Sequence, residues 1–442
     1  MAFSFKKKPP CTPLDSARVL ENRSGRGRLI LQPMRLSFSC WFILFATAMG
    51  LAQSPVPSPT AAAQQTGTPQ VWQMQKSGTT AGLRGIDSVD GTVAWASGTE
   101  GTVLKTVDGG AHWTKCAVPD GDKDGATLDF RGVQAWDATT AIVMASGPGD
   151  KSRLYKTTDG CRTWMLLFKN SDTPDGFFDS LSITKTRTGG RGFLLGDPVA
   201  GRLTIYWTGD RGVHWEQQKS DGLEADAAKL GAFAASNSSI LPDVDNMETG
   251  MKGPDFFAVG GKGGSFVFVR VDALCTMGIV HDFPEKCDIP AFSEFHRVPV
   301  PVKSGTESTG IFALGEDRDD NVQPAPGVKQ RHPGPNHPLI VVGGDYAAPN
   351  ESIGTAAWSV DGGWTWAASA TPPRGYRSTV QWSASEKLWI TAGTNGSDIS
   401  RDDGRTWQPL DDGNWNALSL PFIVGPKGRI ARLNASALPP AK

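Results

Sequence analysis

An octapeptide that recurs five times constrains the fold of this chain more than any other feature. Its pattern is Ser/Thr-x-Asp-x-Gly-x-x-Trp, with Cys in place of Gly in one copy. The pattern is typical of a tight turn between two strands, because an Asp side chain can accept hydrogen bonds from main-chain N–H groups and Gly adopts φ values that a Cβ atom forbids. The copies are Thr106–Trp113, Thr157–Trp164, Thr208–Trp215, Ser359–Trp366 and Ser400–Trp407.

We interpret the octapeptides as structural turns rather than as catalytic or calcium-binding sites. The Asp is expected to cap the turn, and the Trp is expected to fill the apolar space below it. The residues assigned this structural role are Asp108, Trp113, Asp159, Trp164, Asp210, Trp215, Asp361, Trp366, Asp402 and Trp407.

A second repeat surrounds the first. An apolar strand runs into a Gly-rich turn and then into another strand seven times, and the chain's 52 Gly and 31 Pro disfavour long helices. Seven hairpins, most of them followed by an octapeptide, predict seven four-stranded units. The turns are Ser97–Gly101, Ser146–Ser152, Gly196–Gly201, Gly260–Gly264, Gly343–Gly354, Gly393–Ser397 and Gly425–Gly428.

The two ends of the repeat region explain how the seven units close. Ala417–Leu433 supplies three strands without an outer partner, and Val71–Gln75 is a strand with no preceding partners. Pairing the two hides both sheet edges, which would otherwise promote aggregation. The sequence therefore predicts an all-β fold, a seven-bladed β-propeller over residues 70–434 that is closed by its N-terminal strand.

The N-terminal region has a different composition. Residues 1–52 hold eight basic and two acidic side chains, and Leu36–Ala48 is apolar and followed by small residues, which is typical of a secretory signal peptide. Residues 53–69 form a Pro/Ser/Thr/Ala-rich linker, and residues 435–442 form a short tail. We expect an exported protein, periplasmic or extracellular, that touches a membrane only if the leader remains uncleaved as an anchor.

Charge and cysteine content exclude several classes of function. The chain beyond residue 52 carries 36 basic and 43 acidic side chains, which argues against binding nucleic acid. Export permits disulfides, and we favour Cys275–Cys287 and Cys116–Cys161 over four free thiols. The sequence contains neither a zinc-binding pattern nor a dinucleotide fingerprint, so we expect no metal and no cofactor.

A candidate site follows from the propeller topology. The first strand of each blade lies nearest the axis, so equivalent strand starts should surround one end of the central channel, on the face opposite the octapeptide turns. We call this end the top face. Three of these starts carry Arg, and guanidinium groups suit carboxylates and other anions. The alternative is a salt-bridge network with the nearby Asp residues that only seals the channel. The predicted ligand-binding residues are Arg84, Arg131, Arg377, Asp179, Asp197, Arg202, Asp345 and Tyr346.

The octapeptide is similar to the Asp-box of BNR-type β-propellers. Leu83–Trp113 resembles the repeat of the photosystem II stability/assembly factor-like family, and GPGDKSRLYKTTDG, GDPVAGR, AFAASNSS and VGGDYAAP resemble segments of its bacterial members. The resemblance implies a seven-bladed propeller behind a targeting signal, with an Arg-rich face that Arg84 and Arg131 match in position. It therefore implies a monomeric binding scaffold whose partner is a protein segment or another polar or anionic ligand.

Sialidases also carry Asp-boxes, which makes a glycoside hydrolase with a glycan ligand the alternative function. Such an enzyme needs three Arg on the substrate carboxylate and a Tyr nucleophile with a Glu partner. The chain has three Arg that could form this triad, Arg84, Arg131 and Arg377. The catalytic candidates are Tyr346 or Tyr376 as the nucleophile and Glu351 as its partner. Leu83–Ile86 lacks the Pro of the sialidase Phe-Arg-Ile-Pro motif, and seven blades would place the groups differently from six. We therefore favour a binding protein over an enzyme.

Overall fold

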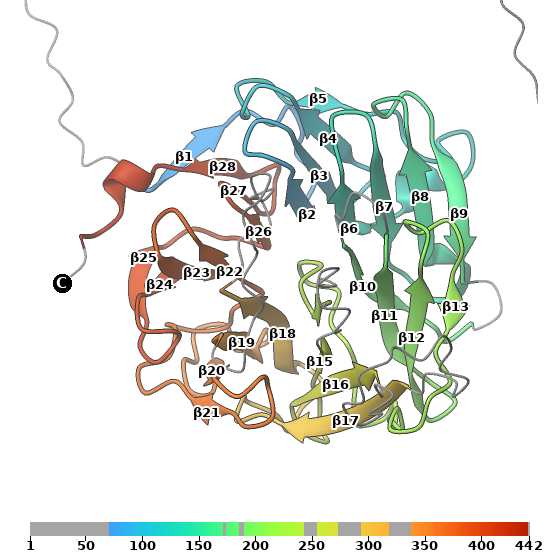
Figure 1. The fold of residues 1–442 in the computed structure, drawn as a ribbon. Coiled ribbons are helices and arrows are strands. Elements are labelled where there is room, and N and C mark those ends of the chain that lie inside the picture. Colours follow the sequence, from blue (N-terminus) through green and yellow to red (C-terminus); the bar gives the residue numbers. More distant parts are fainter. Residues whose placement is uncertain are drawn as a thin grey trace, which may run out of the picture. The chain divides into compact units, whose positions relative to one another are not determined.

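The computed structural model describes residues 70–170, 174–184, 190–242, 254–272, 293–317 and 337–440. These residues form 28 strands in seven four-stranded antiparallel sheets, arranged as the blades of a propeller (Figure 1). Helix is confined, within these ranges, to the short 3₁₀ turns η1 (Gly125–Thr127), η2 (Gly149–Lys151) and η3 (Ala435–Ala437). The predicted all-β, seven-bladed fold is confirmed.

Each blade is numbered by its order in the chain. Blade one contains β2 (Leu83–Ser88), β3 (Ala94–Gly98), β4 (Val103–Thr106) and β5 (Thr114–Lys115). Blade two contains β6 (Phe130–Ala135), β7 (Ala141–Ala145), β8 (Arg153–Thr157) and β9 (Met165–Lys169). Blade three contains β10 (Phe178–Ile183), β11 (Gly192–Val199), β12 (Arg202–Thr208) and β13 (Glu216–Gln217). Blade four contains β14 (Ile240–Leu241), β15 (Asp255–Val259), β16 (Phe266–Asp272) and β17 (Ser293–Pro299).

The last three blades complete the ring. Blade five contains β18 (Thr309–Glu316), β19 (Leu339–Asp345), β20 (Ala356–Ser359) and β21 (Ala367–Ala368). Blade six contains β22 (Thr379–Ser383), β23 (Leu388–Gly393), β24 (Gly396–Ser400) and β25 (Gln408–Asp411). Blade seven contains β26 (Ala417–Ser419), β27 (Phe422–Val424), β28 (Ile430–Leu433) and, as its outer strand, β1 (Trp72–Gln75).

The N-terminal strand closes the propeller as predicted. β1 pairs antiparallel with β28, so that Trp72 lies opposite Leu433 and Gln75 opposite Ile430. The Trp72 side chain is only 4% exposed and lies 6.1 Å from the Trp415 ring, measured between centroids. Ring closure therefore rests on burial of Trp72 as well as on main-chain pairing.

The five octapeptides, called Asp-boxes below after the motif that they resemble, share one hydrogen-bond pattern, which the first copy illustrates. The Thr106 hydroxyl accepts the N–H of Gly110 at 2.9 Å, and Asp108 Oδ1 accepts the N–H of His112 at 2.9 Å. Gly110 has φ +87°, in the left-handed region that favours glycine. The Asp therefore caps a turn between the third and fourth strands of its blade.

One Asp-box carries a disulfide in place of its glycine. Cys161 occupies the glycine position with φ +69° and is bonded to Cys116, which follows β5. The bond joins the outer edge of blade one to the Asp-box turn of blade two. The other favoured pair, Cys275–Cys287, lies outside the described residues, as do the leader and the linker.

The chain itself closes the central channel, which the sequence did not indicate. We call Gly231–Ser239, between β13 and β14, the channel segment, and Figure 1 shows it in light green inside the ring of blades. Asn237 accepts the N–H of Leu181 in β10 at 2.7 Å, and the Ser238 carbonyl accepts the N–H of Leu314 in β18 at 2.8 Å. Ser236 donates to the carbonyl that precedes β22. Asn237 also donates to the Val133 carbonyl of β6 at 3.4 Å. The segment that leads into blade four therefore contacts blades two, three, five and six, which places it across the channel.

Candidate functional site

The first strands of four blades contain a β-bulge at the same place. One residue is left out of the pairing between the first and second strands, and this residue is Arg84 in β2, Arg131 in β6 and Asp179 in β10. In β18 it is Phe312, which we did not predict. A bulge redirects the side chain of its extra residue. The slot expected from the sequence is thus a backbone feature of blades one, two, three and five, and its residue is polar in the first three.

Arg84 and Arg131 share a single carboxylate. Arg131 Nε donates to Asp129 Oδ2 at 2.8 Å, and Arg84 Nε lies 3.9 Å from Asp129 Oδ1. Arg84 Nε and Asp129 Oδ1 are buried and have no hydrogen-bond partner in the described part of the chain. The guanidinium side chains are 36% and 30% exposed. Two positive charges therefore face the top of the channel against one nearby negative charge.

Asp179 and Asp197 lie deeper, beside the channel segment. Asp197 accepts the N–H of Ala232 at 3.1 Å, and burial raises its pKa. Burial, reinforced by the charge of Asp197, raises the pKa of Asp179 well above its usual range, and the charge of Arg131 opposes this shift. These two carboxyl groups lie against the channel segment, with Asp179 buried and Asp197 half-buried.

An aromatic wall borders the same opening. Phe233 of the channel segment stacks on Phe312 at 4.0 Å between centroids, and Phe312 meets the edges of Tyr376 and Tyr346 at 4.8 and 6.1 Å. Burial raises the pKa of Tyr376, and the positive charge of Arg84 acts against that rise. Tyr346, by contrast, is 53% exposed. The wall therefore presents one tyrosine ring on the face that carries the Arg pair.

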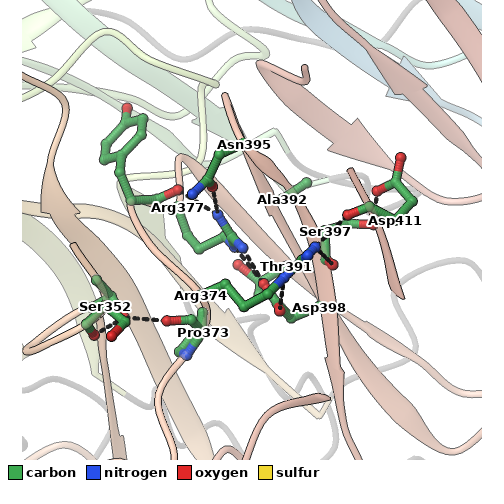
Figure 2. Close-up of polar contacts among 12 residues, drawn as sticks. Ser352, Pro373, Arg374, Arg377, Thr391, Ala392, Asn395, Ser397, Asp398 and Asp411 are labelled. Carbon is green, nitrogen blue, oxygen red and sulfur yellow. Dashed lines mark hydrogen bonds and ion pairs between the residues drawn. The ribbon is translucent and has the colours of Figure 1, made fainter. Parts of the chain in front are cut away.

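Arg377 is not part of this opening, contrary to the sequence prediction. Its side chain is fully buried, and its Nε donates to Asp398 Oδ2 at 2.7 Å while Nη1 donates to the Tyr376 carbonyl at 2.8 Å (Figure 2). Nη2 also bonds to Asp398, and Asn395 accepts from Nη1. Because every nitrogen already has a protein partner, Arg377 stabilises blade six and is unavailable to a ligand.

The remaining predicted ligand-binding residues are dispersed. Arg202 lies 3.3 Å from Glu224 at the edge of blade three. Asp345 is buried and accepts the N–H of Ala347 at 2.9 Å, so it holds its own turn. The alternative of a salt-bridge network that seals the channel required Arg202 and Arg377 to pair with Asp179, Asp197 or Asp345. In the described structure Arg202 pairs with Glu224 and Arg377 with Asp398 instead.

The constellation needed for glycoside hydrolysis is not assembled. Tyr376 is buried, Glu351 forms an ion pair with Lys303, and Arg377 bonds to Asp398. Tyr346 and Glu351 are both exposed, in the turn between β19 and β20. Because Arg377 is paired with Asp398 inside blade six, the three guanidinium groups of a sialidase site are not gathered around this tyrosine.

Two features of the site escaped the sequence analysis. Asp129 lies only two residues before Arg131, so its closeness to the predicted Arg was visible in the sequence. No sequence signal indicated the position of the channel segment, because its sequence carries neither a strand period nor a charge pattern.

The described residues hold no group of three or more His, Cys, Asp or Glu side chains that could bind a metal ion. Within the same ranges, the structure has no helix with the length and apolar character needed to span a membrane.

Fold and site together define a seven-bladed β-propeller whose channel is crossed by a segment of its own chain and whose partly exposed Arg pair lies at one end. No protein-family model and no curated protein matches the chain. Among solved structures it is similar to YCF48 bound to D1 peptide, with 17% identity and a TM-score of 0.49 over 83% of this chain and 97% of that one. It is also similar to YCF48 from Cyanidioschyzon merolae, with 16% identity and a TM-score of 0.48 over 83% and 99%. At identities and TM-scores this low, neither similarity carries an argument about function.

Proposed function

We propose that this protein is a binding scaffold that recognises a protein segment on its top face, with a carboxylate of the segment held by Arg84 and Arg131. The observation that carries the proposal is the arrangement of two partly exposed guanidinium groups around the single carboxylate of Asp129. Arg131 is oriented by that carboxylate and by the Ala234 carbonyl at 3.3 Å, and the Arg84 Nε has no hydrogen bond within the described residues. Because the Arg84 side chain is 36% exposed, the exposed part of its guanidinium can hold a ligand carboxylate through a charge-assisted bond.

Exposed apolar side chains on the turn that carries Tyr346 of the aromatic wall support a peptide rather than a small inorganic anion. Tyr346 is 53% exposed and Ile353 is 84% exposed, and both belong to the turn between β19 and β20. This turn is anchored by blade six, since the Pro349 carbonyl accepts the Asn395 side chain at 2.8 Å and the N–H of Tyr376 at 3.0 Å. Exposed apolar side chains on an ordered turn mark contact surfaces for other proteins.

Export is part of the proposal. Two features support it: the leader predicted from the sequence, and the disulfide between Cys116 and Cys161, which persists in oxidising compartments. Cell fractionation followed by peptide mapping without reductant would test it. Cytoplasmic protein with both thiols alkylatable would contradict it.

Peptide arrays with free and amidated C-termini test the binding function. We expect free carboxylates to be preferred, and Arg84→Ala to weaken capture about tenfold, a loss of about 1.4 kcal/mol in binding free energy. Raising the salt concentration should reduce the preference, because the contact is partly exposed. Arg162→Ala is the matched control, since Arg162 is an exposed Arg on the Asp-box turn of blade two, at the opposite face.

The competing explanation is a purely structural Arg pair. It predicts that Arg84→Ala lowers the melting temperature and leaves peptide capture unchanged. Equal capture of free and amidated peptides, with wild-type capture by Arg84→Ala, would therefore refute the proposed site. No specific observation favours glycoside hydrolysis, so we do not develop it.

A further inference from the structure

Two carboxyl groups on neighbouring strands of blade three lie next to each other, against the channel segment. The β-bulge of β10 leaves Asp179 beside Gly196, and Asp197 follows Gly196 in β11. The Asp197 N–H donates to the Phe177 carbonyl at 3.1 Å, which brings the two acidic residues together. Asp179 is 2% exposed, and its Oδ2 has no hydrogen-bond partner in the described part of the chain. Because an ionised carboxylate is costly to bury without a partner, such a pair is expected to hold a proton.

The groups packed around β10 do not neutralise this pair. β6 contributes Arg131, but its Nε donates to Asp129 at 2.8 Å and its Nη1 to the Ala234 carbonyl at 3.3 Å. β7, β14 and the channel segment also lie against β10, and they carry no ionisable side chain. Burial and then the charge of Asp197 raise the pKa of Asp179 well above its usual range, against the opposing charge of Arg131.

Both carboxyl groups face the same stretch of main chain. We call Gly231–Ala235 the first half of the channel segment. Asp197 Oδ1 accepts the N–H of Ala232 at 3.1 Å, and the Ala234 N–H is directed at Asp179. Asp197 is half-buried, so a proton on the pair can exchange with solvent. Lifting the first half of the segment would let water reach both carboxyl groups and remove the penalty of burying their charge.

Neutral groups hold the second half of the channel segment, Ser236–Ser239. Asn237 accepts the N–H of Leu181 at 2.7 Å, and the Ser238 carbonyl accepts the N–H of Leu314 at 2.8 Å. A change of charge on the Asp pair therefore acts on the first half of the segment and leaves the anchors of the second half unchanged.

We propose that Asp179 and Asp197 form a pH-sensitive lock on the first half of the channel segment. With one proton on the pair, the segment stays closed over both carboxyl groups. When that proton is lost at higher pH, the two negative charges repel and the first half lifts to admit water. This half also supplies the Ala234 carbonyl that orients Arg131, so the lock affects one guanidinium of the Arg pair. The proposal does not depend on the function proposed for the top face.

Hydrogen exchange of the full chain between pH 5 and pH 9, corrected for the intrinsic pH dependence of exchange, tests the lock. The closed state is most stable below the ordinary Asp pKa of about 4 and loses stability as the pH rises towards the raised pKa. If opening releases one proton, the opening constant of Gly231–Ala235 should rise by up to about tenfold per pH unit in this range. Ser236–Ser239 is the internal control and should show no such rise.

Asp179→Asn removes the ionisable group and keeps its size, so Gly231–Ala235 should stay protected over the whole pH range. Asp90→Asn is the matched control, because Asp90 caps an exposed turn between β2 and β3, and it should behave like wild type. Asp197→Asn keeps the test decisive if Asp179→Asn does not fold. It should make the total rise in opening smaller, because one of the two repelling charges is gone.

Three results of the exchange experiment would overturn the lock: opening of Gly231–Ala235 that does not change with pH, a wild-type rise in Asp179→Asn, or the same pH dependence in both halves of the segment. Protection that follows added calcium or EDTA rather than pH would identify a cation site instead, and would also overturn it.

Discussion

Replacing Trp72 by Ala tests whether the N-terminal strand holds the propeller closed. The side chain packs in the apolar cluster between blades six and seven that includes Ile390, Trp415 and Ile423. Its Nε1 donates to Ser397 Oγ at 3.1 Å. The substitution leaves the main-chain pairing of β1 with β28 possible, so it isolates the contribution of the side chain.

The size of the effect follows from burial. Truncating a buried Trp to Ala costs about 3–5 kcal/mol in the free energy of unfolding. Unfolding entropy of about 2.1 cal/mol/K per residue gives about 0.8 kcal/mol/K for a propeller of this length. The melting temperature of Trp72→Ala should therefore fall by about 4–6 °C.

The assay is thermal unfolding followed by near-ultraviolet circular dichroism, with Met74→Ala as the matched control. Met74 belongs to the same strand and is 54% exposed, so its truncation should change the free energy of unfolding by less than about 0.5 kcal/mol. If the two variants melt at the same temperature, closure does not depend on burial of Trp72 and the reasoning is wrong. Greater aggregation of Trp72→Ala on heating would agree with an exposed sheet edge.

Three other outcomes are expected. Arg377→Ala should destabilise the fold by about 3–5 kcal/mol, measured by urea unfolding, because it leaves Asp398 buried without its main partner; unchanged stability would contradict the structural role. With Cys116→Ser in both proteins, Cys161→Gly should unfold at higher denaturant concentration than Cys161→Ser, by about 1 kcal/mol, because residue 161 has φ +69°; equal midpoints would argue against backbone strain there. Hydrogen bonds from the His112 N–H and ring lower the pKa of Asp108 to about 2, so its stabilising effect is complete above its unfolded pKa of about 4 and is lost as the pH falls towards 2. The melting-temperature difference between wild type and Asp108→Asn should therefore shrink between pH 5 and pH 2, and a constant difference would contradict that pKa.

The sequence was sufficient to predict the architecture, because its signals are local and repeated. An Asp-box needs only eight consecutive residues to form its turn, and a Gly-rich hairpin needs little more. Seven such units with one unpaired strand at each end leave a closed ring as the arrangement that hides every edge. The pairing of the N-terminal strand with the last blade could be predicted for this reason, although the two lie at opposite ends of the propeller sequence.

The candidate site could be predicted only in part. Equivalent positions in repeated blades do converge, which is why Arg84 and Arg131 were found from the sequence. Arg377 lies one position before this slot in blade six, because its N–H bonds to the Gly343 carbonyl as the N–H of Leu83 bonds to the Gly425 carbonyl. Its guanidinium is satisfied within its own blade by Asp398 in β24 and by Asn395 in the turn between β23 and β24. A shift of one residue along a strand changes the direction of a side chain, and the alignment of the repeats missed this shift.

The sequence by itself determined the turns, the blade count and the closing strand, since each follows from contacts within a blade or from the need to cover an edge. Only the tertiary structure decided what fills the channel and which charges remain available. The channel segment forms no regular element and is held by hydrogen bonds to first strands far apart in the chain, from Leu181 to Ser378. Such bonds exist only once the ring is closed, because closure is what brings those strands around one axis.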